Sequence, residues 1–336
     1  RVQVALVAPL PVREPPGAAW AMLKAIFPSS EPRHSLTASG AKRAPPGALY
    51  ADSYFQSGTT GLWVYTRRWA SEGIARGFVV LLHGSGDHCG RLEHLGGLLA
   101  GKGYAVITMD HQGHGRSEGD RVHVERFDDY VKDVQQFIEI EIARTPELGK
   151  LPTFIFGHSM GTLIATKVVE AMRKGGTPFK GMIATSSCLY IDPSTVTPFN
   201  LMCGRFLSDM LPKWPVPWVT GPDFPISHDE MAEEAYKHDP LMYRGACRPR
   251  QSMEIYSALQ SVFASAGDFD TPYLAIHGSG DKVCLLEGTE KWHAATRSSD
   301  KELMVLDGAY HELLHEEDIT RERALGAIVQ WIEKRT

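Results

Sequence analysis

The stretch Pro152-Thr153-Phe154-Ile155-Phe156-Gly157-His158-Ser159-Met160-Gly161 decides how this chain is interpreted. Residues 152–156 are apolar and β-prone and predict a strand, whereas residues 160–173 have helical character. A serine flanked by glycines between a strand and a helix is typical of a nucleophile elbow, a strained turn that holds the serine hydroxyl clear of a sheet. Glycines two residues on either side let the strand and the helix approach without a Cβ clash. We therefore expect Ser159 to be a nucleophile if the chain also supplies a base, an acid and an oxyanion hole.

Composition indicates an ordinary globular protein. The 336 residues, 43% hydrophobic and 22% charged, suit one large α/β domain with an insertion or two smaller domains. A formal net charge of −5 argues against binding to nucleic acid. No apolar stretch reaches the length of a transmembrane helix. The five scattered cysteines indicate neither a disulfide framework nor a zinc site, so we expect an intracellular protein that is soluble or bound peripherally to a membrane.

Residues 1–48 differ in character from the rest of the chain. They carry six Lys and Arg residues against two Glu, with many Pro and Ala and no clear periodicity. Three interpretations stay open: the trailing part of an organellar targeting sequence, an arm that binds a protein partner, or a solvated tail. We therefore treat 1–48 as an N-terminal extension of uncertain order.

From residue 49 onward, predicted strands alternate with predicted helices. Residues 50–56 and 62–69 predict an antiparallel hairpin. Apolar runs predict five further strands besides the one before Ser159, at 78–82, 104–109, 181–185, 272–276 and 302–306. Helical patterns lie between them, at 91–102, 127–144, 251–266, 287–295 and 319–334. This alternation predicts an α/β fold with a mainly parallel sheet covered by helices on both faces, built from 49–188 and 241–336.

Residues 189–240 interrupt that alternation. The segment holds eight prolines and many apolar residues between two predicted strands. A stretch of this length is usually functional, and its apolar residues suit a helical lid that closes over the site or contacts a lipid surface. A helical cap packed permanently on the core is the other interpretation, and both stay open.

A candidate acid and a candidate base follow Ser159 in the order found in α/β-hydrolases, which is serine, acid, histidine. Asp281 comes just after the predicted strand 272–276, and His311 just after 302–306. Because parallel strands end at the same edge of a sheet, we expect both side chains to lie near Ser159. Three competitors are worse placed, because they precede a strand, end one or lie within a helix: Asp270, Asp307 and His293.

Two backbone N–H groups are expected to form the oxyanion hole. One donor belongs to the residue after the nucleophile, Met160. The second should come from the loop after an early strand, and the loop 83–88 places Ser85 there.

These motifs resemble the monoacylglycerol lipase family of serine α/β-hydrolases, which is related to lysophospholipases and to hydrolases labelled serine aminopeptidases. The resemblance spans roughly residues 50–335. The matching segments are His83-Gly84-Ser85-Gly86-Asp87-His88 with Gly90-Arg91, then 110–119, 157–161, 238–241, 280–283 and 308–312.

The resemblance implies hydrolysis of a monoacylglycerol, or a similar single-chain lipid ester, to fatty acid and glycerol through an acyl-enzyme. It implies no metal ion and no cofactor, and it places the triad on Ser159, Asp281 and His311. Residues at positions comparable to the family's head-group site are Asp87, Arg91, His158 and His315. Cys284 resembles a site-proximal cysteine of some members, although an inert buried thiol is the other interpretation.

Two other functions stay open at this stage. The fold and triad also suit another carboxylesterase, a thioesterase, a lysophospholipase or a peptidase, because they do not define the substrate. The chain could also serve as an accessory subunit that is anchored through 1–48 and retains the triad.

Overall fold

The computed structural model describes residues 50–71, 73–190, 196–216 and 224–336. The predicted extension 1–48 and parts of the predicted insertion therefore lie outside the described residues. Across the described part of the chain, no helix is both long and apolar enough to cross a membrane.

A single eight-stranded sheet, ordered β1-β2-β4-β3-β5-β6-β7-β8, forms the centre of the described structure. The strands are β1 (Tyr50–Gln56), β2 (Trp63–Trp69), β3 (Gly77–Leu82), β4 (Tyr104–Met109), β5 (Thr153–His158), β6 (Gly181–Thr185), β7 (Tyr273–Gly278) and β8 (Lys301–Leu306). β2 runs antiparallel to β1 and β4, and the other neighbours are parallel. The predicted hairpin and the predicted mainly parallel sheet are both confirmed.

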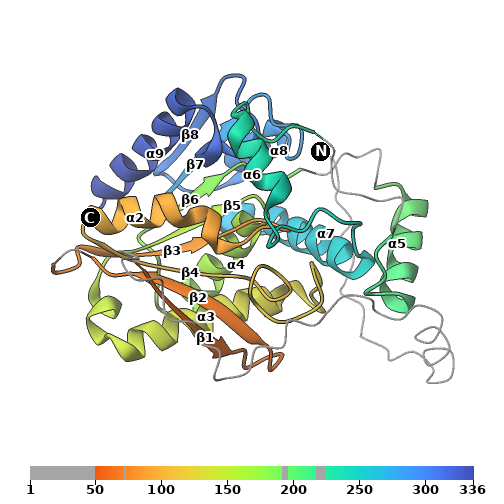
Figure 1. Ribbon diagram of the computed structural model, residues 1–336, viewed down its shortest axis with the longest axis horizontal. Helices are drawn as coiled ribbons and strands as arrows, with labels where there is room; N and C mark the ends of the chain where they lie inside the picture. Colours follow the sequence, from red (N-terminus) through yellow and green to blue (C-terminus); the bar gives the residue numbers. More distant parts are fainter. Residues whose placement is uncertain (1–49, 72, 191–195, 217–223) are drawn as a thin grey trace.

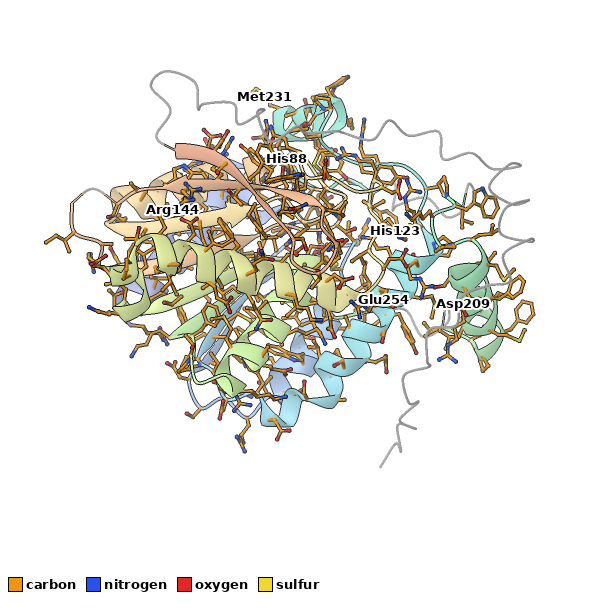
Figure 2. The ribbon with its side chains drawn as sticks, turned by 90° about the horizontal axis from the view of Figure 1, so that it is seen from below. His88, His123, Arg144, Asp209, Met231 and Glu254 are labelled. Atoms are coloured by element: carbon orange, nitrogen blue, oxygen red, sulfur yellow. The ribbon has the colours of Figure 1, made fainter. Side chains whose placement is uncertain are left out.

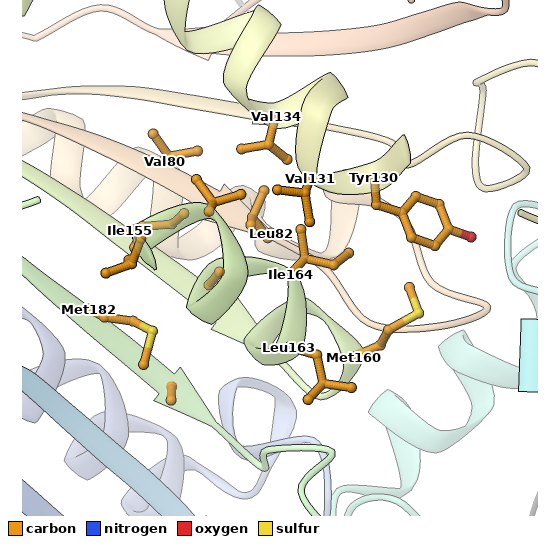
Figure 3. Packing of buried hydrophobic residues seen from close by; sticks show 14 of the residues in the cluster. Val80, Leu82, Tyr130, Val131, Val134, Ile155, Met160, Leu163, Ile164 and Met182 are labelled. Atoms are coloured by element: carbon orange, nitrogen blue, oxygen red, sulfur yellow. The ribbon is translucent and has the colours of Figure 1, made fainter. Parts of the chain in front are cut away.

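Helices cover both faces of the sheet (Figure 1). Alternate residues of β3 point to opposite faces, so Val79 packs with α2 (Glu93–Gly101) and α9 (Asp318–Glu333). On the other face, Val80 belongs to a second core with α3 (Phe127–Arg144), α4 (Met160–Lys174), α7 (Pro249–Ala264) and α8 (Leu286–Ala295). Figure 3 shows Ile164 of α4 beside Val131 of α3. The architecture confirms the α/β fold expected from the alternation of elements, and its strand order and layers are those of the α/β-hydrolase fold that the motifs implied.

The described part of the predicted insertion contains two helices, α5 (Pro198–Met210) and α6 (Glu230–His238). α5 packs against α7, and Figure 1 shows it at the periphery, beyond α7 and away from the sheet. Whether this segment is a lid or a fixed cap stays a prediction.

Strand order brings the ends of β3 and β5 together. The two strands pair in parallel, with Leu82 opposite Gly157. The chain leaves β3 toward β4 on one side and continues from β5 toward β6 on the other, which makes this a topological switch point. Ligands of α/β proteins bind in the crevice at such a point, and both Ser159 and the loop 83–88 follow these strands.

A buried carboxyl group ties α3 to the β1–β2 turn. Asp133 is fully buried and accepts hydrogen bonds from Ser57 Oγ (2.5 Å) and Gln112 Nε2 (3.1 Å). Burial raises the pKa of Asp133 from 3.8 to about 7, because the two hydrogen bonds offset only part of the cost of burying a charge.

Asp133→Asn is expected to flatten the pH dependence of stability. Since the pKa is raised by folding, the folded protein binds more protons than the unfolded chain, and the free energy of unfolding falls as pH rises from 3.8 to about 7. From pH 5 to pH 8, the free energy of unfolding should fall by about 2–3 kcal/mol more in wild type than in the variant. Urea denaturation at both pH values measures this loss, with Asp128→Asn on the exposed side of α3 as control. An equal decrease in the free energy of unfolding in wild type and Asp133→Asn would contradict the prediction.

Candidate active site

Ser159 occupies a strained turn between β5 and α4. Its φ of 53° lies in the left-handed region, which non-glycine residues adopt at a cost of about 1–3 kcal/mol. A Cβ at Gly157 would stand 2.4 Å from the carbonyl oxygen of Gly161, and one at Gly161 would stand 2.5 Å from that of Leu82. Both glycines are therefore required by close backbone approach, which is the arrangement expected of a nucleophile elbow.

The candidate base and acid lie together at the carboxyl ends of β7 and β8. His311 Nδ1 is 2.8 Å from Asp281 Oδ2. The other carboxylate oxygen of Asp281 accepts backbone N–H groups from Val283 (2.8 Å) and Cys284 (2.9 Å). On the opposite side, the hydroxyl of Ser186 donates to the carbonyl of His311 at 2.6 Å. Both candidates are thus held by their neighbours in a buried position.

Electrostatics favours an ionised acid and a basic histidine. Burial raises the pKa of Asp281, but hydrogen bonds with His277 and His311 outweigh it and hold that pKa well below its usual range. Burial lowers the pKa of His311, yet the hydrogen bond and the charge of Asp281 raise it overall. His277 Nε2 lies 3.3 Å from Asp281 Oδ2. This residue was not identified as part of the site from the sequence, where it only followed the predicted strand 272–276.

The structure brings the three triad candidates to one place. The ring of His158, the residue before Ser159, has its centroid 5.0 Å from that of His311. The carbonyl of Ser159 accepts the N–H of Cys188, two residues after Ser186. The competitors lie elsewhere: Asp270 pairs with Arg173 on the surface, and Asp307 is an exposed acceptor for Ser279.

The loop 83–88 lies directly beside the elbow. A Cβ at Gly84 would stand 3.1 Å from Cβ of Ser159. Gln251 of α7 donates from Nε2 to Ser85 Oγ (3.0 Å) and lies 3.9 Å from Met160 Sδ. The two expected oxyanion-hole residues are therefore neighbours bridged by one buried amide. Sequence reasoning missed Gln251, because nothing in the helical pattern of 251–266 distinguishes it.

Three of the four candidate head-group residues contact Glu312, and the fourth, Asp87, faces Arg91. Glu312 Oε2 accepts from Arg91 Nη2 (2.8 Å) and lies 3.0 Å from His315 Nδ1, and Glu312 Oε1 lies 3.2 Å from His158 Nε2. Asp87 faces the same guanidinium, with Oδ1 3.4 Å from Arg91 Nε. Glu312 was not predicted as a site residue, although it follows His311 directly and ends the matching segment 308–312.

The two carboxyl groups of this network differ in their proton affinity. Burial would raise the pKa of Glu312, but the charges of Arg91 and His158 hold it well below its usual value. Burial raises the pKa of Asp87, although Arg91 opposes the change. Glu312 is therefore a fixed anion within hydrogen-bond reach of a histidine next to the elbow.

A second cysteine meets Cys284 at the site. Cys284 Sγ lies 3.9 Å from Ser159 Oγ, and its thiol hydrogen-bonds that of Cys188. The hydrogen bond with Cys188, together with burial, raises the pKa of the Cys284 thiol well above its usual range. A thiol with a raised pKa is a poor nucleophile, which favours the interpretation of an inert buried group.

Comparison with known proteins places this geometry in a family. The family model described as serine aminopeptidase, S33 matches residues 73–318. Monoglyceride lipase of Mus musculus is 29% identical over 298 residues, 89% of this chain and 96% of that protein. Monoacylglycerol lipase of Mycolicibacterium smegmatis is 28% identical over 276 residues, 82% of this chain and 95% of that protein. The crystal structure of Paleococcus ferrophilus monoacylglycerol lipase matches with a TM-score of 0.70 and 28% identity, covering 81% of this chain and 99% of that chain.

These matches confirm the resemblance inferred from the motifs. The family model spans β3 to β8, the elbow and the loops after β7 and β8. The chain belongs to the serine aminopeptidase S33 family.

Proposed function

We propose that this protein is a serine hydrolase that cleaves monoacylglycerols, or similar single-chain lipid esters, to fatty acid and glycerol. The observation that carries the proposal is the pairing of His311 with Asp281 beside the strained Ser159. The named activities of the mouse and mycobacterial relatives support the choice of substrate.

In the proposed mechanism, His311 takes the proton of Ser159 as Oγ attacks the ester carbonyl. Asp281 accepts from Nδ1–H, which keeps Nε2 as the proton-accepting nitrogen and stabilises the imidazolium that forms. Asp281 stays ionised throughout, consistent with its lowered pKa.

The backbone N–H groups of Ser85 and Met160 would stabilise the oxyanion, an effect worth about 3–4 kcal/mol per donor in a serine protease. His311 would then protonate the leaving glycerol oxygen, and a water molecule activated by the same histidine would release the fatty acid. The polar network around Glu312, with Asp87, Arg91 and His315, supplies donors and acceptors for glycerol hydroxyls.

A substrate panel tests the proposal. Purified full-length protein would be assayed with monoacylglycerol, lysophospholipid, acyl-CoA and aminoacyl substrates of equal chain length, with fatty acid or amine release as the readout. We expect the highest kcat/KM for monoacylglycerol. A higher value for another substrate would assign the protein to a different hydrolase activity, and no hydrolysis with no fluorophosphonate labelling would support an accessory role.

We also propose that α5 contacts the lipid surface that holds the substrate. Phe199, Met202 and Phe206 are 67%, 60% and 64% exposed and share one face of α5, at the spacing of an amphipathic helix. Figure 2 shows α5, marked by Asp209, at the edge of the molecule with side chains directed away from the core. An exposed apolar face of this kind suits insertion at a membrane interface.

The double variant Phe199→Ser/Phe206→Ser is expected to bind phosphatidylcholine vesicles about tenfold more weakly, because two exposed rings no longer enter the interface. Co-sedimentation with vesicles measures the change. Ile319→Ser is the matched control, since Ile319 is 79% exposed on α9, which Figure 1 shows on the opposite side of the molecule. An equal loss of vesicle binding in the double variant and in Ile319→Ser would contradict a specific role for α5.

A further inference from the structure

Three potential metal ligands meet at the site, and the proposed hydrolysis needs no metal there. One ligand atom each from His158, His311 and Glu312 lies within 4.8 Å of the others, and all three residues are buried. Two imidazoles and a carboxylate form a ligand set that Zn²⁺ commonly adopts, with a fourth position left open.

The hydrogen bonds around the histidines orient their rings as in a metal site. His311 Nδ1 is held by Asp281 (2.8 Å), and His158 Nδ1 by the hydroxyl of Thr185 (3.2 Å). Each ring is therefore anchored through Nδ1, and Nε2 of His158 faces Glu312 Oε1, the atom with which it would share the ion. Metal-binding histidines almost always make such a contact with the nitrogen that does not coordinate.

The distances suit a small tetrahedral ion. His158 Nε2 and Glu312 Oε1 are 3.2 Å apart. Two ligands at Zn²⁺ bond lengths near 2.0–2.1 Å in a tetrahedron are about 3.3 Å apart, so this pair can bind with little movement. The three ligand atoms lie within 4.8 Å of one another, so the third ligand, His311, would have to approach by at most about 1.5 Å.

The local charge also favours a dication. The buried cluster contains two carboxylates, Asp281 and Glu312, against the guanidinium of Arg91. Arg91 already pairs with Glu312 Oε2, so Oε1 can turn to a metal without breaking that ion pair. An excess of buried negative charge is costly, and a bound cation would offset it.

We propose that His158, His311 and Glu312 form an inhibitory binding site for Zn²⁺. A zinc ion bound there occupies the nitrogen of His311 that would otherwise accept the Ser159 proton. Hydrolysis then ceases, because the base is no longer available. The inhibition rests on the proposed catalytic role of His311, whereas the binding of the ion does not. Hard cations that prefer oxygen ligands, such as Mg²⁺ and Ca²⁺, should not bind.

Inhibition is tested by titrating Zn²⁺ into the full-length protein in a non-chelating buffer. We expect Zn²⁺ to abolish hydrolysis and fluorophosphonate labelling, with full recovery after addition of EDTA. Glu312→Gln should raise the concentration for half-inhibition, relative to its own zinc-free rate, by at least about tenfold. His94→Gln, which removes an exposed histidine, should leave that concentration unchanged. Equal zinc sensitivity in both variants would overturn the site.

Binding is tested separately in the Ser159→Ala protein, which retains all three ligands and does not need to be active. Co²⁺ should give visible d–d absorption typical of a four-coordinate site, displaced by one equivalent of Zn²⁺, without the near-ultraviolet band of thiolate ligation. A thiolate band would assign the ion to Cys188 and Cys284 instead. Absence of any cobalt spectrum and of any zinc-induced rise in Tm would overturn the proposal, whatever the substrate panel shows.

Discussion

Ser159→Ala lowers kcat for monoacylglycerol by at least about 10⁴-fold, the loss expected when the nucleophile of a serine hydrolase triad is removed. Alanine has no oxygen to attack the carbonyl, and water would have to act from a site shaped for Oγ. The fold should persist, because the strained φ of 53° is no more costly for alanine than for serine. Fatty acid release under saturating substrate measures the change, together with loss of fluorophosphonate labelling.

Ser279→Ala provides the matched control for that loss. Ser279 lies in a second His-Gly-Ser-Gly-Asp loop, residues 277–281, which repeats the sequence of 83–87. Its exposed hydroxyl donates to Asp307 and accepts from the Gly308 N–H, and no hydrogen bond joins it to Ser159. Its removal should change kcat less than about threefold, as is usual for surface polar groups. Undiminished hydrolysis by Ser159→Ala would exclude the proposed acyl-enzyme.

Asp281→Asn is expected to lower kcat by about 10³–10⁴-fold with little change in KM. Asp281 accepts on both oxygens, from two backbone N–H groups on one side and from His311 on the other. An asparagine has only one acceptor oxygen, and the two backbone donors will hold it. The amide NH₂ then faces His311 Nδ1 and favours the tautomer protonated on Nε2, which cannot take the Ser159 proton.

Asp307→Asn separates this effect from a general loss of negative charge near the base. Asp307 is closer to His311 in sequence than Asp281 is, but it is exposed and bonded to Ser279. The variant should keep kcat within a few fold of wild type. A large decrease in kcat in Asp307→Asn, with a small decrease in Asp281→Asn, would assign the acid to Asp307 instead of Asp281.

The parts of the fold that were predictable are those with local signals. Apolar runs identified the strands and helical periodicity identified the helices, because burial on one or both faces imposes a repeat that can be read along the chain. Helix ends were less well placed: α7 begins at Pro249, two residues before the predicted start, because Pro is favoured in the first turn of a helix. The inserted segment 189–240 had no such repeat, and its boundaries remain a prediction.

The sequence by itself determined the elbow, the order of serine, acid and histidine, and their placement at strand ends, since a parallel sheet sends all those ends to one edge. Only the tertiary structure showed how the polar groups pair. Glu312 meets Arg91 across 221 positions and His158 across 154, and Gln251 meets Ser85 across 166. Such contacts depend on strand order, which places β5 between β3 and β6, and on the packing of α7. A side chain whose partners are hundreds of residues away leaves no periodic trace in the sequence, so its role appears only when the sheet is assembled.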